Sequence, residues 1–452
     1  MKAPLSQHLS FGRLILGALP SILMMVSISL YSVIDGLFVS NFAGKTQFAA
    51  VNLIYPYVMT LGALGFMMGT GGTALVAKKL GEGKIDEANR HFSNCVIFSL
   101  GLGLISTVIS LFLLPNISKA LGADEEMLPH CIRYGQILIA GVTFFNFQNL
   151  FQSFLMAAER PGLGFGVTLL AGITNIILDA ALIAGAKMGI VGAGIGTIAG
   201  QFIGGVLPLI FFLRNNNSPL KLRMHKFDWK GILKMVTNGM SEFFANIFVS
   251  IVSIVMNILL MRHFGQDGVS AYGVICYVWL VYAAIFIGFN IFVAPRISYN
   301  LGANNKKELR HLYLSSLLVL LLFGVIQLVV SESLAYPLSY VFTSYDQGLL
   351  ELTTKAMRIY SIIYCAIGIN MFGSAFFTAL NNGVMSLVLS TARLIAIELP
   401  CILLFSLLIG GDGIWWGVVV GELVSVLMNL LVMFLFRKRY GYMKPKEEAA
   451  LS

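Results

Sequence analysis

The segment LGEGKIDE at residues 80–87 returns as LGANNKKE at residues 301–308. Two further pairs keep this spacing of 221 residues (80 to 301): NLFQSFLMA from residue 149 with NMFGSAFFT from residue 370, and FAAVNLIYP from residue 48 with VSAYGVICY from residue 269. Apolar segments resemble one another by chance, but a register shared across a loop and two helices is not common. We therefore interpret the chain as two similar halves.

The composition is that of a membrane protein. Of 452 residues, 57% are hydrophobic and 11% are charged, whereas about a quarter of the residues of a soluble domain are charged. About 12 stretches are long enough to span a bilayer with roughly 20 apolar residues each. They centre near Leu23, Leu61, Leu104, Phe144, Ile173, Ile198, Val249, Ile285, Leu320, Ile363, Leu394 and Val424. The runs are continuous rather than alternating, which favours an all-α integral membrane protein over a barrel.

Six spans in each half return the chain to its starting side, so the two repeats have the same orientation. They are then related by a pseudo-two-fold axis along the membrane normal. We expect an N-lobe of helices 1–6 at residues 1–213, a basic cytoplasmic linker at 214–230, a C-lobe of helices 7–12 at 231–436, and a basic cytoplasmic tail at 437–452. The first apolar run begins near Phe11 and persists past Leu37, too long for a cleavable signal peptide.

The net charge of +9 is explained by the membrane topology of the chain and does not indicate a polyanionic partner. Basic residues cluster in alternate loops, at 78–90, 214–230, 296–310 and 437–446, while the loops between hold few. This is the asymmetry of cytoplasmic loops in membrane proteins. It predicts that both termini are cytoplasmic, and it argues against nucleic acid as a partner.

Two aspartates lie inside apolar runs of the first half: Asp35 in SISLYSVIDGLFVSNF and Asp179 in LLAGITNIILDAALIAGA. A carboxylate at bilayer depth costs several kcal/mol unless it is paired, hydrated or protonated. Asn175 lies one helical turn before Asp179, and Thr197 lies in the glycine-rich run at 189–202, where helices approach closely. Such oxygens suit Na⁺ or a proton shared by two carboxylates. The alternative for Asn175 and Thr197 is hydrogen bonding between helices.

The repeat adds an asymmetry to this candidate site. At the 221-residue spacing, the four positions become Met256, Ala396, Pro400 and Val418 in the second half. The C-lobe therefore lacks every member of the set. The pattern fits one ion site that serves one lobe.

The second half has its own ionisable residues at apparent depth: Glu242, Arg393, Glu398 and Glu422. A buried charge needs a partner, so we expect Arg393 to pair with Glu398 or Glu422. Glu242 has no obvious mate. It either faces a cavity or serves a role that the sequence does not define.

The segments YSVIDGLFVSNF, LGEGKIDEANRHFS, NIILDAALI and VGAGIGT resemble the multidrug and toxic compound extrusion (MATE) family. The likeness runs from about Phe11 to Arg437 and fits the branch of small bacterial multidrug exporters, within the multidrug/oligosaccharidyl-lipid/polysaccharide flippase superfamily. One departure is the start of the seventh helix, where the family's Gly-x-Pro reads NGMSE at residues 238–242.

The resemblance implies a V-shaped pair of six-helix bundles in the bacterial cytoplasmic (inner) membrane, and we expect a monomer. It implies export of amphipathic, often cationic drugs or metabolites in exchange for H⁺ or Na⁺ by alternating access, with no cofactor and no metal other than Na⁺ at the coupling site. The family's cation site falls on Asp35, Asn175, Asp179 and Thr197, and Pro20 matches the proline at which the first helix is proposed to bend. Gln148, Asn149 and Gln152 fall where the N-lobe drug cavity lies, although bonding between helices would also explain them; Glu242 is a further cavity candidate.

Three other functions compete with antiport, and a cation channel is the weakest of them, because the repeated bundles lack a recognisable filter. A membrane enzyme is disfavoured, because the six histidines lie near loops or span ends and no HExxH, GxSxG or P-loop motif occurs. A lipid-linked oligosaccharide flippase of the same superfamily is the more serious alternative. Such a carrier needs cationic residues in its cavity to hold a pyrophosphate, and Arg393 is the one good candidate at depth.

Overall fold

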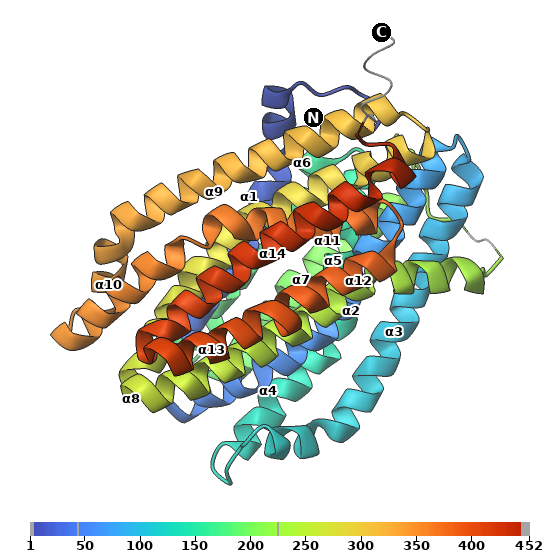
Figure 1. The fold of residues 1–452 in the computed structure, drawn as a ribbon. Helices are drawn as coiled ribbons and strands as arrows, with labels where there is room; N and C mark the ends of the chain where they lie inside the picture. Colours follow the sequence, from blue (N-terminus) through green and yellow to red (C-terminus); the bar gives the residue numbers. More distant parts are fainter. Residues whose placement is uncertain (1–3, 43–44, 224–225, 444–452) are drawn as a thin grey trace.

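The computed structural model describes residues 4–42, 45–223 and 226–443, and its regular elements there are all helical (Figure 1). The first half contains α1 (Phe11–Phe42), α2 (Lys45–Gly81), α3 (Ile85–Ala120), α4 (Leu128–Ala140), α5 (Val142–Ala157), α6 (Pro161–Asp179), the π-helix η1 (Ala180–Gly185) and α7 (Ile190–Leu213). The second half contains α8 (Trp229–Gly302), α9 (Lys306–Thr343), α10 (Gln347–Ser361), α11 (Tyr364–Ala379), α12 (Gly383–Thr391), the π-helix η2 (Ala392–Glu398), α13 (Leu399–Ile409) and α14 (Gly411–Tyr440).

The apolar runs of the sequence form the spans. Among the described residues, 9 helical stretches are long and apolar enough to cross a membrane, and α10 and α11, bent by 50° at the break between them, are long and apolar enough only when taken together. Element α8 consists of two helical arms that meet at Gly265, whose φ of 62° suits glycine. The prediction of an all-α membrane protein is confirmed. The number of 12 spans stays a prediction, because it depends on how the two arms of α8 and the α4–α5 pair are counted.

The 221-residue repeat reappears in the turns. Gly83 and Asn304 are equivalent positions, and both have positive φ, 74° and 54°. Gly189 and Gly410 are also equivalent, with φ of 56° and 79°. Left-handed backbone is favoured by glycine and tolerated by asparagine. The two halves therefore end and restart their helices in the same way.

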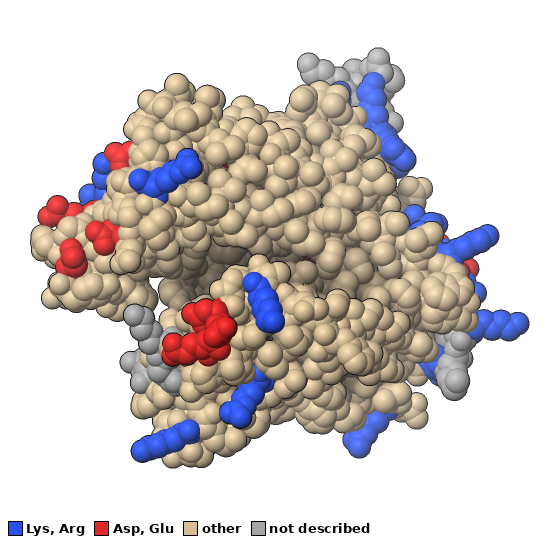
Figure 2. All heavy atoms as spheres, turned by 90° about the horizontal axis from the view of Figure 1, so that it is seen from below, with Lys and Arg blue, Asp and Glu red and all other residues tan. Residues whose placement is uncertain are grey.

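Helices α2 and α8 hold the two halves together through glycine. A Cβ on Gly71 would lie 2.1 Å from the carbonyl oxygen of Met235, and one on Gly239 would lie 1.9 Å from the carbonyl oxygen of Met67. Absence of side chains lets the two backbones touch, as is typical of helix packing in membranes. The face of the molecule seen from below is hollowed near its centre (Figure 2).

The connection between the halves packs on the first half. The side chain of Leu220 is fully buried, and the backbone N–H of Lys221 donates to the Asn89 side chain at 2.7 Å. Element α8 begins at Trp229, inside the predicted linker, and α14 continues to Tyr440, inside the predicted tail at 437–452. The tail from residue 444 lies outside the described residues.

Candidate functional site

Asp35 on α1 and Asp179 on α6 meet inside the first half. Their carboxyl groups lie close enough for each to influence the ionisation of the other. Asp179 is fully buried and Asp35 is half-buried. Two carboxylates in contact cannot both be ionised cheaply, so a proton or a cation between them lowers the energy of the pair.

Asn175 and Thr197, the other two predicted site residues, lie on the helices that meet at Asp179. Asn175 lies one turn before Asp179 on α6, and Thr197 follows Gly196 on α7. Gly196 sets the α6–α7 contact, because a Cβ there would lie 2.3 Å from Asp179 Oδ1 and 3.4 Å from the Asn175 carbonyl oxygen. The structure therefore places Asp35 near Asp179, Asn175 one turn before Asp179 on the same helix, and Thr197 next to the glycine that packs on Asp179. A role of Asn175 and Thr197 as ligands stays a prediction.

The oxygens of this site lack donors. Asp35 Oδ1, both carboxylate oxygens of Asp179, Asn175 Oδ1 and Thr197 Oγ1 are buried and have no hydrogen-bond partner in the described part of the chain. Leaving buried acceptors unpaired costs free energy. A hard cation such as Na⁺ takes oxygen ligands, and a proton would let one carboxyl group donate to the other. The donor set therefore fits either ion.

The helices that carry Asp35 and Asp179 have two further features. The π-helix η1 begins directly after Asp179, and π-helical turns inside α-helices occur frequently at functional sites. Helix α1 passes through Pro20 without a break in helical structure. A bend at Pro20 stays a prediction.

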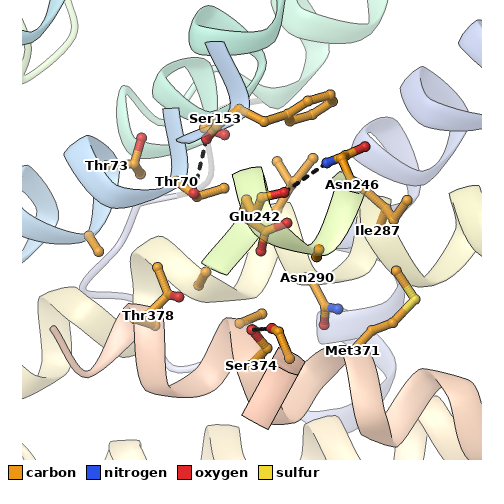
Figure 3. A pocket seen from close by; sticks show the side chains of 18 of the residues that line it. Thr70, Thr73, Ser153, Glu242, Asn246, Ile287, Asn290, Met371, Ser374 and Thr378 are labelled. Carbon is orange, nitrogen blue, oxygen red and sulfur yellow. Dashed lines mark hydrogen bonds between the residues drawn. The ribbon is translucent and has the colours of Figure 1, made fainter. Parts of the chain in front are cut away.

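A second feature is a cavity of about 310 Å³ between the two halves (Figure 3). Its lining comes from α2, α5, α8, α11, α12 and η2, and Glu242 is its half-buried acid. Asn290, Ser153 and Thr378 also line it. Sequence reasoning missed these three, although Asn290 and Ser153 are polar residues inside apolar runs and could have been noticed for that reason.

The other three residues predicted to line the drug cavity do not line this one. They are buried on α5: Gln148, Asn149 and Gln152. Gln148 donates to the Tyr31 hydroxyl at 3.3 Å, and Asn149 donates to the Gly62 carbonyl oxygen at 3.0 Å. The Gln152 amide has no partner in the described residues. Gln148 thus contacts α1 one turn before Asp35, and a role of these residues in substrate binding stays a prediction.

The ionisable residues of the second half form a network. Arg393 Nη2 donates to Glu422 Oε1 at 2.6 Å, which confirms the expected ion pair and selects Glu422 as the partner. Asn370 also donates to Glu422, at 2.6 Å. Glu398 Oε2 is buried without a hydrogen-bond partner among the described residues. All three charged residues line a cavity of about 410 Å³ beside the first one, and Arg393 lines both.

Comparisons with known proteins agree with this arrangement. The family model described as MatE matches residues 20–181 and again residues 243–404. The multidrug export protein MepA of Staphylococcus aureus (strain N315) is 22% identical over 424 residues, 93% of each chain. MepA of Staphylococcus saprophyticus is 23% identical over 424 residues, also 93% of each chain.

Solved structures share the fold. An outward-facing multidrug resistance MATE family transporter of the MOP superfamily superposes with a TM-score of 0.91 at 21% identity, covering 96% of this chain and 98% of that one. A MOP superfamily transporter from Pyrococcus furiosus gives 0.90 at 21% identity, with 97% and 98% covered. The matches confirm the predicted fold, and they are to transporters rather than enzymes, as the sequence indicated.

Proposed function

The chain belongs to the multidrug and toxic compound extrusion (MATE) family, and on this premise we propose that it exports amphipathic, cationic small molecules in exchange for H⁺ or Na⁺ by alternating access. The observation that carries the proposal is the contact between Asp35 and Asp179, surrounded by buried oxygens that lack donors. Such a site lowers its energy when a cation or proton enters. The family is one of exporters, and the relatives are named multidrug export proteins. These names support the proposal that ion binding at this site drives export.

Coupling follows if ion and substrate favour different arrangements of the two lobes. Occupation of the Asp35–Asp179 pair removes the repulsion between the carboxylates and changes the preferred packing of α1, α6 and α7. Substrate in the central cavity favours the opposite arrangement. Each ligand shifts the equilibrium only by its difference in affinity for the two states. Inward movement of one positive charge supplies about 2.3 kcal/mol per 100 mV.

The charges of the cavity favour cationic cargo. Arg393 is neutralised by Glu422 at 2.6 Å, whereas Glu242 lines the cavity and forms no ion pair within the described residues. The unbalanced charge facing the cavity is therefore negative. A lipid-linked oligosaccharide carrier would need free cations there to hold a pyrophosphate, so flipping is the weaker alternative.

We place the protein in the bacterial cytoplasmic membrane, as a monomer with both termini cytoplasmic. The relatives are bacterial, and the spans make the chain a multi-pass membrane protein. The start of α1 and the end of α14 lie at the same end of the molecule (Figure 1), as an even number of spans requires. The alternating basic loops support the cytoplasmic assignment of that end.

Efflux from proteoliposomes tests the proposal. Purified protein would be reconstituted with a fluorescent organic cation inside, and pH and Na⁺ gradients would be imposed separately. We expect one of the two gradients to drive efflux, and Glu242→Gln to weaken transport of the cation more than that of a neutral analogue. Efflux that ignores both gradients would contradict antiport, and equal effects on the two compounds would contradict the role of Glu242.

A further inference from the structure

Residues 4–10, which precede α1, lie against the start of α9. His8 Nδ1 lies 2.6 Å from Glu308 Oε2, and the His8 and His311 rings are 4.6 Å apart between centroids. His311 Nε2 lies 2.8 Å from the Leu9 carbonyl oxygen. One ligand-capable atom from each of His8, Glu308 and His311 lies within 4.8 Å of the other two. This cluster lies outside both cavities and the carboxylate pair.

The three side chains are suitable ligands for a transition metal. Glu308 and His311 are three residues apart on α9, so they share a face of that helix, and this Glu-x-x-His spacing also occurs in metal sites of helix bundles. Imidazole nitrogens and a carboxylate oxygen are the ligands that Zn²⁺ takes, with a fourth position left for water. We propose that His8, Glu308 and His311 form a binding site for a divalent transition-metal ion of the Zn²⁺ class.

The surroundings of these ligands support the site. Glu308 is only 9% exposed, and its Oε1 is buried with no hydrogen-bond partner in the described chain. Among the described residues, His8 is the one ion-pair partner of the Glu308 carboxylate, and no lysine or arginine there forms an ion pair with it. The contact from His311 to a backbone carbonyl oxygen is of the kind that orients a metal-ligating imidazole. Asn305 fixes the turn by accepting from the Glu308 backbone N–H at 3.1 Å.

The site joins the two lobes. The Leu5 backbone N–H donates to Glu159 at the α5–α6 turn of the N-lobe, at 2.8 Å, and the Leu5 and Leu9 side chains are buried. Three residues later, His8 contacts α9 of the C-lobe. A metal ion held by His8, Glu308 and His311 therefore links a segment anchored on the N-lobe to the C-lobe.

This link has a consequence that rests on the proposed function. Alternating access requires the lobes to move relative to each other at this end of the molecule. A metal ion that holds the N-terminal segment to α9 stabilises the arrangement seen here and slows the transition. The bound ion acts as an inhibitor of transport from outside the substrate and coupling sites.

Binding is measured first, on full-length protein in detergent with any affinity tag of histidines removed. Co²⁺ is the probe, because its visible absorption reports coordination, and Zn²⁺ is the competitor. We expect one Co²⁺ per chain, displaced by Zn²⁺. His8→Ala should lower the affinity at least about tenfold, the minimum lost when even a supporting contact of a metal site is removed.

His8 offers the cleanest variant, because its side chain is 64% exposed and its loss leaves the helices intact. His311→Ala should weaken binding as strongly, and His130→Ala on α4 is the matched control that should leave it unchanged. No stoichiometric binding, or equal affinity in wild type and His8→Ala, would overturn the site.

Transport is measured second, in proteoliposomes with Zn²⁺ on the side of the chain termini. We expect Zn²⁺ to slow efflux by the wild type and to leave His8→Ala unaffected. Equal inhibition of both proteins would overturn the lobe-linking role. Failure of all gradient-driven efflux would overturn the proposed function instead, and the binding measurement would still decide the metal site.

Discussion

Gly81 and Gly302 are equivalent residues of the two repeats, and each packs against the helix that carries the other. A Cβ on Gly81 would lie 1.9 Å from the carbonyl oxygen of Tyr299, and one on Gly302 would lie 2.0 Å from that of Lys78. Lys78 and Tyr299 are themselves 221 residues apart. The contact is thus reciprocal, as a pseudo-two-fold axis between α2 and α8 requires. The repeat seen in the sequence is the symmetry of the lobe interface.

Gly302→Ala should disrupt this interface, because its Cβ has no room beside the Lys78 carbonyl oxygen. Overpacking of a close contact costs about 1–3 kcal/mol, which we expect to appear as a lower melting temperature of the protein in detergent. Gly101→Ala on α3 is the control, since no atom lies within 4 Å of the added Cβ. Equal melting temperatures for the two variants would show that α2 and α8 accommodate the added Cβ at no cost in stability, which would contradict the prediction.

Gly196→Ala should damage the ion site without removing any of its oxygens. The added Cβ would lie 2.3 Å from Asp179 Oδ1 and would push α7 from the carboxylate. We expect a loss of gradient-driven efflux of up to about a hundredfold, since a misplacement of about 1 Å can cost that much at a preorganised site. Gly166→Ala on α6, where the Cβ meets open space, should transport normally. Normal coupling in Gly196→Ala would show that the geometry at Asp179 is not needed.

The C-lobe ion pair should be structural. Glu422 is 2% exposed, and Glu422→Gln leaves the Arg393 guanidinium without its 2.6 Å partner. Breaking a buried pair costs about 3–5 kcal/mol, whereas replacing both partners by apolar residues is often neutral. We expect a large drop in melting temperature for Glu422→Gln and recovery in the double variant Arg393→Met with Glu422→Met. A double variant as unstable as the single one would assign the network another role.

Asp228 should make the start of α8 sensitive to acid. Its carboxylate accepts the Gly231 backbone N–H at 3.0 Å, and this bond, with His91 and Arg90 nearby, lowers the pKa of Asp228. A carboxyl group whose pKa is lower in the folded state stabilises the fold above about pH 4, its usual pKa, and that contribution is lost as the pH falls further.

Asn is the matched replacement at this position, because it caps a helix without titrating. Asp228→Ala should lose about 1 kcal/mol at neutral pH, the typical value of an N-cap. The melting temperature of Asp228→Asn should fall less steeply than that of the wild type between pH 5 and pH 3. Parallel curves would show that Asp228 does not contribute to the acid sensitivity.

The sequence was sufficient to single out Asp35 and Asp179, because a carboxylate inside an apolar run is costly unless it is paired, hydrated or protonated; their role in ion coupling stays a prediction. It could not choose between Glu398 and Glu422 for Arg393, since Glu398 lies five residues away on η2 itself, Glu422 lies on α14, and only packing decides. It placed Gln148 among cavity candidates, whereas the structure places that side chain against Tyr31. The rotation of each helix about its axis is set by contacts between distant segments. Thr70 and Thr378, far apart in the chain, line one cavity for the same reason.

The most direct test is the ion flux that accompanies transport by Asp35→Asn. In proteoliposomes containing a pH or Na⁺ indicator, wild-type protein should move H⁺ or Na⁺ inward as the cationic substrate leaves. Asp35→Asn removes the titratable group but keeps a side chain of the same size, so we expect a folded protein that moves no coupled ion and exports no substrate against a gradient. Ion-coupled efflux equal to that of the wild type would contradict the assignment of Asp35 and Asp179 as the coupling site.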